Sequence, residues 1–273
     1  MDRQPPAELP EGYVDFYKQL ESWQNEQTIK LRKTFIHHTQ DIEPLLNSRK
    51  KPLLMQVRHY IDEKDFNQVY RALIAFLYEA RPNTALYLDS IMRGIDAFSF
   101  EQIIESLIKL DDKYLQIMAT QLNISEEFLY FTLDHSLRPF LRLIAEHYTD
   151  ALKSETLDWE FYTICPVCGA KSHISRLRSE DGQRLMFCDR CFSEWPSRFL
   201  FCVHCGADKP GSLSFIKIEG DDAYQLFVCE KCKGYLKTYD ERVGGKSVDL
   251  FIANVETVYL DMLAQERGYT NHD

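Results

Sequence analysis

The sequence predicts an α+β protein with an N-terminal all-helical domain, two tandem rubredoxin-like or zinc-ribbon modules, and a C-terminal helix. Two observations predict this architecture. All eight cysteines lie between Cys165 and Cys232, and the first 164 residues contain none. Apolar residues recur at helical spacing up to about residue 160, whereas glycines, cysteines and short alternating stretches follow. The chain is therefore expected to change from helices to strands near that position.

Residues 11–160 are expected to form the helical domain, behind a disordered lead-in over residues 1–10 that holds three of the ten prolines. Ser99 followed by Gln102 is typical of a capping box at a helix start, and Ser125 is expected to cap the last long helix. Pro139 should kink or divide that helix. Helices are predicted over residues 12–40, 65–81, 84–94, 100–109, 112–122 and 126–152.

The cysteine-rich region contains two repeated units, expected over residues 161–198 and 199–243. Each unit begins with Cys-x-x-Cys-Gly, continues as a β-hairpin and ends with a second Cys-x-x-Cys. A closing strand is expected over 235–239. A final helix is expected over 246–268, and its apolar stripe should pack against the rest of the protein. The hairpin strands are predicted over 173–178 with 184–187, and over 213–219 with 224–228.

The four Cys-x-x-Cys pairs predict two metal sites. Each pair places two thiolates on one turn, and two turns complete a tetrahedral site, for which zinc is the favoured metal and iron the alternative. Sequential pairing within each unit is best supported because each hairpin closes a short loop, but crossed pairing stays open. The candidate ligands are Cys165, Cys168, Cys188, Cys191, Cys202, Cys205, Cys229 and Cys232.

Specific roles are expected for four residues that lie close to these cysteines in the sequence. Gly169 and Gly206 follow a pair directly, where the turn needs a positive φ that glycine adopts readily. His204 could replace a thiolate, but the cysteines already fill two sites, so a solvent-exposed turn residue is expected. Trp195 is expected to form a hydrophobic lid on the first ribbon.

The charge balance argues against a nucleic-acid or anionic-membrane partner, because the formal net charge is −10. Between Cys165 and Cys232, nine Lys and Arg balance nine Asp and Glu, and each filled site would add about two negative charges. A local patch of Arg176, Arg178 and Arg184 is the counter-argument. No apolar run approaches a membrane span, and the first ten residues lack signal-peptide features. We therefore expect a cytoplasmic protein without membrane insertion, whose cysteines stay reduced.

The motifs do not predict an enzyme. The helical region holds no phosphate-binding glycine loop, no Gly-x-Ser-x-Gly and no His-Glu-x-x-His. A saturated four-cysteine site has no open coordination position, so both sites are expected to be structural. The turn CPVCG resembles the knuckle of rubredoxins, which leaves an iron redox protein as an alternative. A nucleic-acid-binding zinc-ribbon protein is a second, less favoured alternative.

In order along the chain, the motifs CPVCG, CDRCFSEW, CVHCG, CEKCKGYLK and AQERGY resemble the formate dehydrogenase accessory protein family, FdhE. The resemblance is specific from Cys165 to Tyr269, and the helical region fits in type and position. It implies a cytoplasmic maturation factor that binds the molybdopterin-containing catalytic subunit of formate dehydrogenase and supports its activation.

The resemblance also implies that the eight cysteines are metal ligands. Lys233 departs from some relatives, which place the glycine directly after the last cysteine, and this concerns the local turn geometry. Other positions match the family without a role that the sequence assigns: Glu194, Trp195, Tyr235, Leu236 and Lys237.

Overall fold

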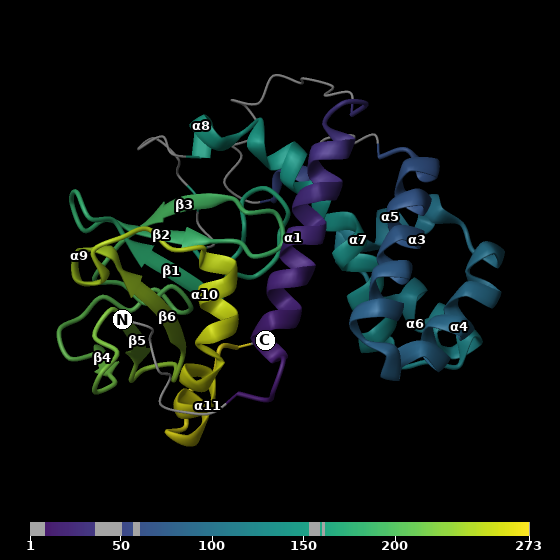
Figure 1. The fold of residues 1–273 in the computed structure, drawn as a ribbon. Helices are drawn as coiled ribbons and strands as arrows, with labels where there is room; N and C mark the ends of the chain where they lie inside the picture. The colour runs from purple at the N-terminus through teal and green to yellow at the C-terminus, as the bar shows by residue number, and fades with distance from the viewer. Residues whose placement is uncertain (1–8, 36–50, 57–60, 153–158, 160–161, 273) are drawn as a thin grey trace.

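The computed structural model describes residues 9–35, 51–56, 61–152, 159 and 162–272. The expected lead-in lies almost wholly outside these residues. Helices occupy one side of the molecule and a sheet the other, with α1 (Tyr13–Leu31) between them (Figure 1). The other helices of the first half are α3 (Glu63–Ala80), α4 (Ala85–Gly94), α5 (Phe100–Lys109), α6 (Lys113–Leu122), α7 (Glu126–Glu146) and α8 (Thr149–Leu152). Short 3₁₀ turns are η1 (Leu53–Met55), η2 (Pro82–Thr84) and η3 (Ile95–Ala97).

The predicted helix starts are confirmed by their caps. The Ser99 hydroxyl accepts a hydrogen bond from the Gln102 N–H (3.3 Å), and the Ser125 hydroxyl accepts one from the Phe128 N–H (3.2 Å). Each cap satisfies one of the N–H groups that the first helical turn leaves unpaired. The serines therefore define where α5 and α7 begin.

The central helix α7 continues through Pro139, so the expected division there is wrong. Proline lacks the N–H that would bond to the carbonyl oxygen four residues earlier, which belongs to His135. That oxygen instead accepts a hydrogen bond from Gln24 Nε2 of α1, at 3.1 Å. A side chain from another helix thus replaces the missing backbone bond. The predicted 126–152 helix breaks only after Glu146, and Thr149–Leu152 forms the separate α8.

The strands form one six-stranded sheet in the order β3-β2-β1-β6-β5-β4. Both predicted hairpins are present and antiparallel. The two halves are joined because β1 and β6 pair in parallel, with Ile174 opposite Lys237 and Leu177 opposite Asp240. The strands are β1 (Ile174–Leu177), β2 (Arg184–Phe187), β3 (Glu194–Ser197), β4 (Leu213–Lys217), β5 (Tyr224–Cys229) and β6 (Tyr235–Asp240).

Strand β3 was not predicted. It carries Pro196, which cannot donate to a neighbouring strand, and β3 lies at the edge of the sheet where one side of the strand has no partner strand. An edge position therefore accommodates a segment whose composition does not suggest a strand.

The single helix expected over 246–268 is wrong, because two helices occupy this segment. They are α10 (Leu250–Glu256) and α11 (Val258–Glu266), preceded by the one-turn α9 (Glu241–Gly244). The side chain of Asp249 caps α10 by accepting hydrogen bonds from the N–H groups of Phe251 and Ile252. The helices separate at Thr257, whose buried hydroxyl donates to the Ala253 carbonyl oxygen at 2.6 Å. A side-chain bond of this kind favours a bend.

The apolar stripe of this segment packs inward as predicted. Phe251 and Leu260 belong to the same buried cluster as Leu226 and Tyr239 of the sheet. Phe251 also meets the ring of Tyr17 on α1, with centroids 6.3 Å apart. Helix α10 therefore lies between the sheet and α1, and α11 packs against β6 (Figure 1). In the described part of the chain, no helix combines the length and apolarity needed to cross a membrane.

Candidate metal centres

All four Cys-x-x-Cys turns share one backbone geometry. The residue after each pair has a positive φ, and its N–H donates to the carbonyl oxygen of the first cysteine at 2.8–3.0 Å. The expectation for Gly169 (φ 78°) and Gly206 (φ 73°) is confirmed. Phe192 (φ 64°) and Lys233 (φ 58°) adopt the same conformation without being glycine. The turn is therefore kept at Lys233, although this conformation is costly for a residue with a side chain.

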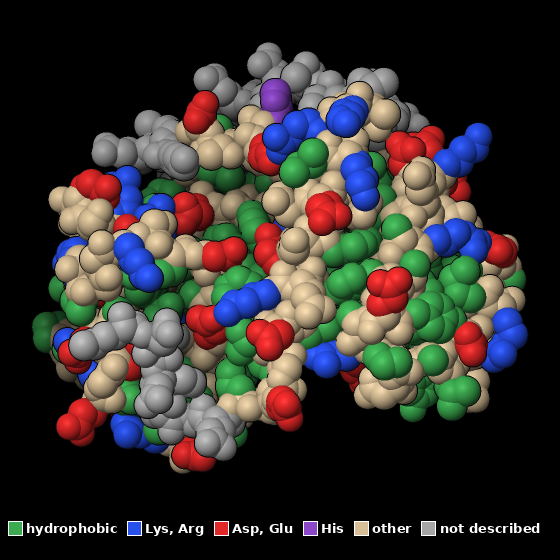
Figure 2. All heavy atoms as spheres, viewed as in Figure 1, with side chains coloured by type: hydrophobic (Ala, Val, Ile, Leu, Met, Phe, Trp, Pro, Cys, Tyr) green, Lys and Arg blue, Asp and Glu red, His purple; other side chains and the backbone are tan. Residues whose placement is uncertain are grey.

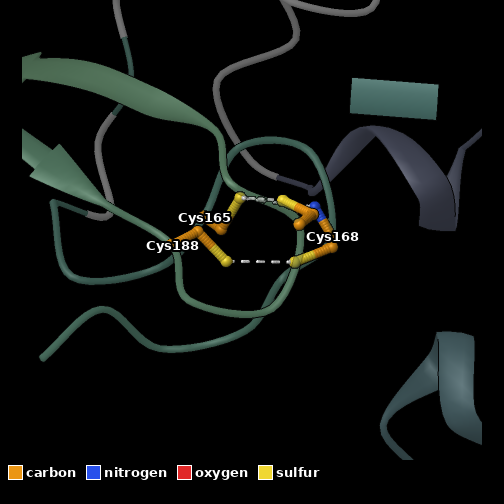
Figure 3. Close-up of side chains that lie close together, drawn as sticks. Cys165, Cys168 and Cys188 are labelled. Atoms are coloured by element: carbon orange, nitrogen blue, oxygen red, sulfur yellow. Dashed lines mark hydrogen bonds between the residues drawn. The ribbon is translucent and has the colours of Figure 1, made fainter. Parts of the chain in front are cut away.

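The structure groups the cysteines as sequential pairing predicts. Within each group, the four sulfur atoms lie within 4.8 Å of one another. The groups are Cys165, Cys168, Cys188 and Cys191, called the first site below, and Cys202, Cys205, Cys229 and Cys232, called the second site. No cysteine belongs to a disulfide. Figure 3 shows three cysteines of the first site pointing their sulfur atoms into one shared space.

The sulfur positions fit a tetrahedral metal ion. In the first site, Sγ–Sγ distances are 3.5 Å for Cys165–Cys191 and 3.5 Å for Cys168–Cys188. In the second site, Cys202–Cys232 and Cys205–Cys229 are 3.7 and 3.8 Å apart. A metal–sulfur bond of about 2.3 Å in a tetrahedron requires sulfur atoms about 3.8 Å apart. Both groups therefore have the donor set and the spacing for zinc, and a tetrahedral four-sulfur iron centre needs the same donors.

The first site is enclosed by the helical region. All four of its cysteines are buried. The N–H groups of Leu53 and Leu54, in η1, donate to the carbonyl oxygens of Pro166 and Val167 at 2.8 and 3.0 Å. A segment more than 100 residues earlier in the sequence thus clasps the first Cys-x-x-Cys turn, and the site forms part of the protein core.

The second turn of this site is held by a buried ion pair. Arg190, between Cys188 and Cys191, donates to Asp134 of α7 at 2.6 Å and to the Leu107 carbonyl oxygen at 2.8 Å. Burial would raise the pKa of Asp134, but Arg190 and Arg138 outweigh it and lower the pKa to about 2. Asp134 is therefore ionised at neutral pH and links the site to the central helix.

Two residues shared with the FdhE motifs support the first ribbon. Trp195 is fully buried in the cluster that contains the first site, as the predicted lid, and its Nε1 donates to the Tyr162 carbonyl oxygen at 3.2 Å. Glu194 accepts from Arg176 Nε at 2.6 Å, and Arg176 also donates to Glu241 at 2.8 Å. Glu194 thus joins β3 to β1 and α9.

The other shared positions anchor the C-terminal helices. Lys237 on β6 is buried, and its Nζ donates to Asp261 at 2.6 Å and to the Asn254 carbonyl oxygen at 2.9 Å. The Tyr235 hydroxyl donates to the same carboxylate at 2.9 Å. Leu236 belongs to the core cluster that includes the first site. The sequence could not assign these roles, because the partners lie on separate elements.

The second site opens to the surface. Cys205 is exposed and Cys232 is partly exposed, whereas Cys202 and Cys229 are buried. Both exposed thiols line a pocket of about 360 Å³ with Lys171, His204 and His272. His204 lies in the turn as expected, but its side chain is only partly exposed, because Nε2 donates to the Tyr235 carbonyl oxygen at 2.8 Å.

The three arginines of the patch noted in the sequence lie in different environments. Arg176 pairs with Glu194 and Glu241, and Arg178 pairs with Asp181. Arg184 is 1% exposed. These three guanidinium groups therefore do not form one surface for phosphate groups.

By sequence, no protein-family model and no curated protein matches this chain. By structure, the chain is similar to the crystal structure of the FdhE protein from Pseudomonas aeruginosa, with a TM-score of 0.63 and 21% identity. The similarity covers 94% of this chain and 86% of that chain. The resemblance of the cysteine motifs to FdhE is therefore confirmed at the level of the fold, which this chain shares over nearly its whole length.

Proposed function

We propose that this protein is a cytoplasmic, non-catalytic accessory protein that binds the catalytic subunit of formate dehydrogenase and supports its activation. The observation that carries the proposal is the FdhE fold with both four-cysteine groups formed by the motifs that resemble that family. Four thiolates saturate a tetrahedral ion, which leaves no position for a substrate. The centres therefore serve to stabilise a binding surface.

The surface offers apolar contacts for a protein partner. Figure 2 shows hydrophobic side chains gathered over α4 and α6. Leu86 and Tyr87 on α4 are 81% and 52% exposed, and Ile117 on α6 is 55% exposed. A second pair of exposed apolar side chains belongs to the second ribbon: Leu200 precedes Cys202 by two residues, and Phe215 lies on β4. Exposed apolar groups of this kind are typical of protein-binding surfaces.

The test is an anaerobic pull-down with the full-length tagged chain from cells that produce formate dehydrogenase. We expect the catalytic subunit to be recovered, and a strain lacking this protein to lose formate dehydrogenase activity. Failure to recover the subunit, together with full activity in the deletion strain, would refute the proposal.

The contact surface can be located with matched substitutions. Leu86→Ser with Ile117→Ser removes one apolar group, and Leu200→Ser with Phe215→Ser removes the other. Met262→Ser is the control, because Met262 is also 55% exposed but lies on α11. The variant pair that abolishes recovery of the subunit identifies the docking surface.

An electron-transfer protein is the second candidate, and one observation favours it. The second site exposes Cys205, which brings a metal–thiolate centre to the surface where a redox partner can approach it. Metal analysis and a visible spectrum after anaerobic purification distinguish the two. Two zinc ions in a colourless protein rule out the redox function, whereas a tetrahedral iron–thiolate spectrum supports it.

A further inference from the structure

Arg184 on β2 is a buried cation whose charge is not balanced by a carboxylate. It is 1% exposed, and its Nε and Nη2 have no hydrogen-bond partner among the described residues. The other two buried arginines of the described chain are paired: Arg190 with Asp134, and Arg142 with Glu21. Burial of an unpaired charge is strongly unfavourable, so a group near Arg184 should supply the opposite charge.

The surroundings of Arg184 point to the second site. The guanidinium lies over the ring of Phe227, 4.3 Å from its centroid. Arg184 also lines a cavity of about 20 Å³ together with Cys202 and Cys229. This volume holds about one water molecule, which would hydrate the guanidinium but would not balance its charge.

A metal-filled second site would supply the negative charge that Arg184 lacks. Four thiolates around one divalent ion carry a net charge of about −2. An arginine guanidinium stays protonated in proteins, so Arg184 would lie beside an anionic centre.

We propose that Arg184 is the counter-ion of the second metal site and strengthens metal binding there. It acts through the thiolates and is a positioning residue, not a ligand. Because Arg184 comes from the first ribbon and the cysteines from the second, this interaction couples the two ribbons.

The test measures zinc affinity at the second site in the full-length chain, by competition with a chromogenic chelator. Arg184→Met keeps the length of the side chain but removes the charge. We expect zinc affinity at the second site to fall about 10- to 100-fold, the range for loss of a group that supports a metal ligand. Arg184→Lys should retain most of the affinity, and the first site should be unchanged. The Cys205→Ser variant identifies which of the two zinc ions belongs to the second site.

A second measurement separates charge from packing. In the Cys205→Ser background, brought to one zinc per chain, Arg184→Met should raise stability to urea, because it removes a buried cation that lacks a counter-ion. In the fully loaded protein the same substitution should lower it. A residue that serves only to fill space would lower stability in both states.

Arg198→Met is the control, since Arg198 lies over the Phe201 ring at 4.9 Å in the same ribbon but is exposed. The proposal is overturned if Arg184→Met leaves the zinc affinity within twofold of the wild type, or if Arg198→Met lowers it equally. Should Arg184→Met not fold, Arg184→Gln is compared with Arg184→Lys, and equal affinities overturn the proposal.

Discussion

The first metal site lies inside the protein, whereas the second lies at its surface, although the backbone turns that form them are the same. The first is clasped by η1, α5 and α7, and all of its cysteines are buried. The second has one exposed and one partly exposed cysteine beside an open pocket. The same four-cysteine arrangement thus occurs in two environments. The first site joins the helices to the sheet, and the second site is in contact with solvent.

Because of this difference in burial, we expect the two sites to contribute unequally to the stability of the protein. At the first site, loss of the metal would leave four buried thiols in the core and would loosen the contacts to the central helix. At the second, the ribbon can open towards solvent while the helices keep their own core. The four changes below test this contrast, from the largest expected effect to the smallest.

The largest effect is expected from Cys188→Ser in the first site. Structural zinc has apparent binding free energies of about 10–16 kcal/mol, comparable with the whole stability of a domain. Cys188→Ser should therefore abolish the cooperative thermal transition followed by far-UV circular dichroism. Cys205→Ser, the matched change in the second site, should leave the helical transition close to that of the wild type. Equal losses in the two variants would contradict the contrast.

Asp134→Asn should produce the next largest effect. It removes the carboxylate that pairs with both Arg190 and Arg138, and leaves the buried Arg190 and the 13% exposed Arg138 without this counter-ion. We expect a loss of about 3–5 kcal/mol in the free energy of unfolding by urea. The control is Asp208→Asn near the second site, which removes an exposed pair with Arg198 and should cost about 0–1 kcal/mol. Similar losses would show that the buried pair has no special role.

A pH-dependent effect on stability is expected from His135, which follows Asp134 in the sequence. His135 is buried, Nδ1 accepts from Gln24 at 2.8 Å, and burial lowers its pKa well below the ordinary value. The unfolded chain takes up a proton near pH 6.5, whereas the folded chain does not. Stability is therefore fully present above pH 6.5 and falls below it, by up to about 1.4 kcal/mol per pH unit.

The measurement is urea unfolding at pH 7.5 and pH 5.5. The wild type should lose stability between these values, and His135→Gln should reduce that loss. His147→Gln is the control, because the His147 side chain is exposed. An unchanged pH dependence in His135→Gln would exclude His135 as its source.

The smallest effect is expected from Lys233→Gly in the second site. Lys233 has φ 58° at a turn position where the first pair of each ribbon is followed by glycine, and its ion pair with Glu230 is exposed. Glycine removes the strain of the left-handed conformation, and this outweighs the extra conformational entropy that glycine gives the unfolded chain. We therefore expect a gain of about 0.5–1 kcal/mol in the unfolding free energy. Phe192→Gly is the contrasting change in the first site. Phe192 carries Arg142 over its ring at 3.7 Å, so its loss should outweigh any relief of strain.

Much of the site could be predicted from the sequence because its geometry is local. The spacing of Cys165 and Cys168 places both thiols on one turn, and the hairpin brings back Cys188 and Cys191. The serine caps at Ser99 and Ser125 are local for the same reason, since each bond spans three residues. The features that the sequence did not predict depend on contacts between residues far apart in the chain.

The four turns, the two hairpins and most helix boundaries could be predicted because bonds between residues close in the chain specify them. The same short distances favoured the sequential grouping of the cysteines, which the structure then established. The burial of the first site, the parallel pairing of β1 with β6 and the continuation of α7 through Pro139 became evident in the folded chain alone. The tertiary structure also decided that Arg184 of one ribbon lies beside the cysteines of the other. Burial and charge compensation depend on elements far apart in the sequence, which local spacing does not encode.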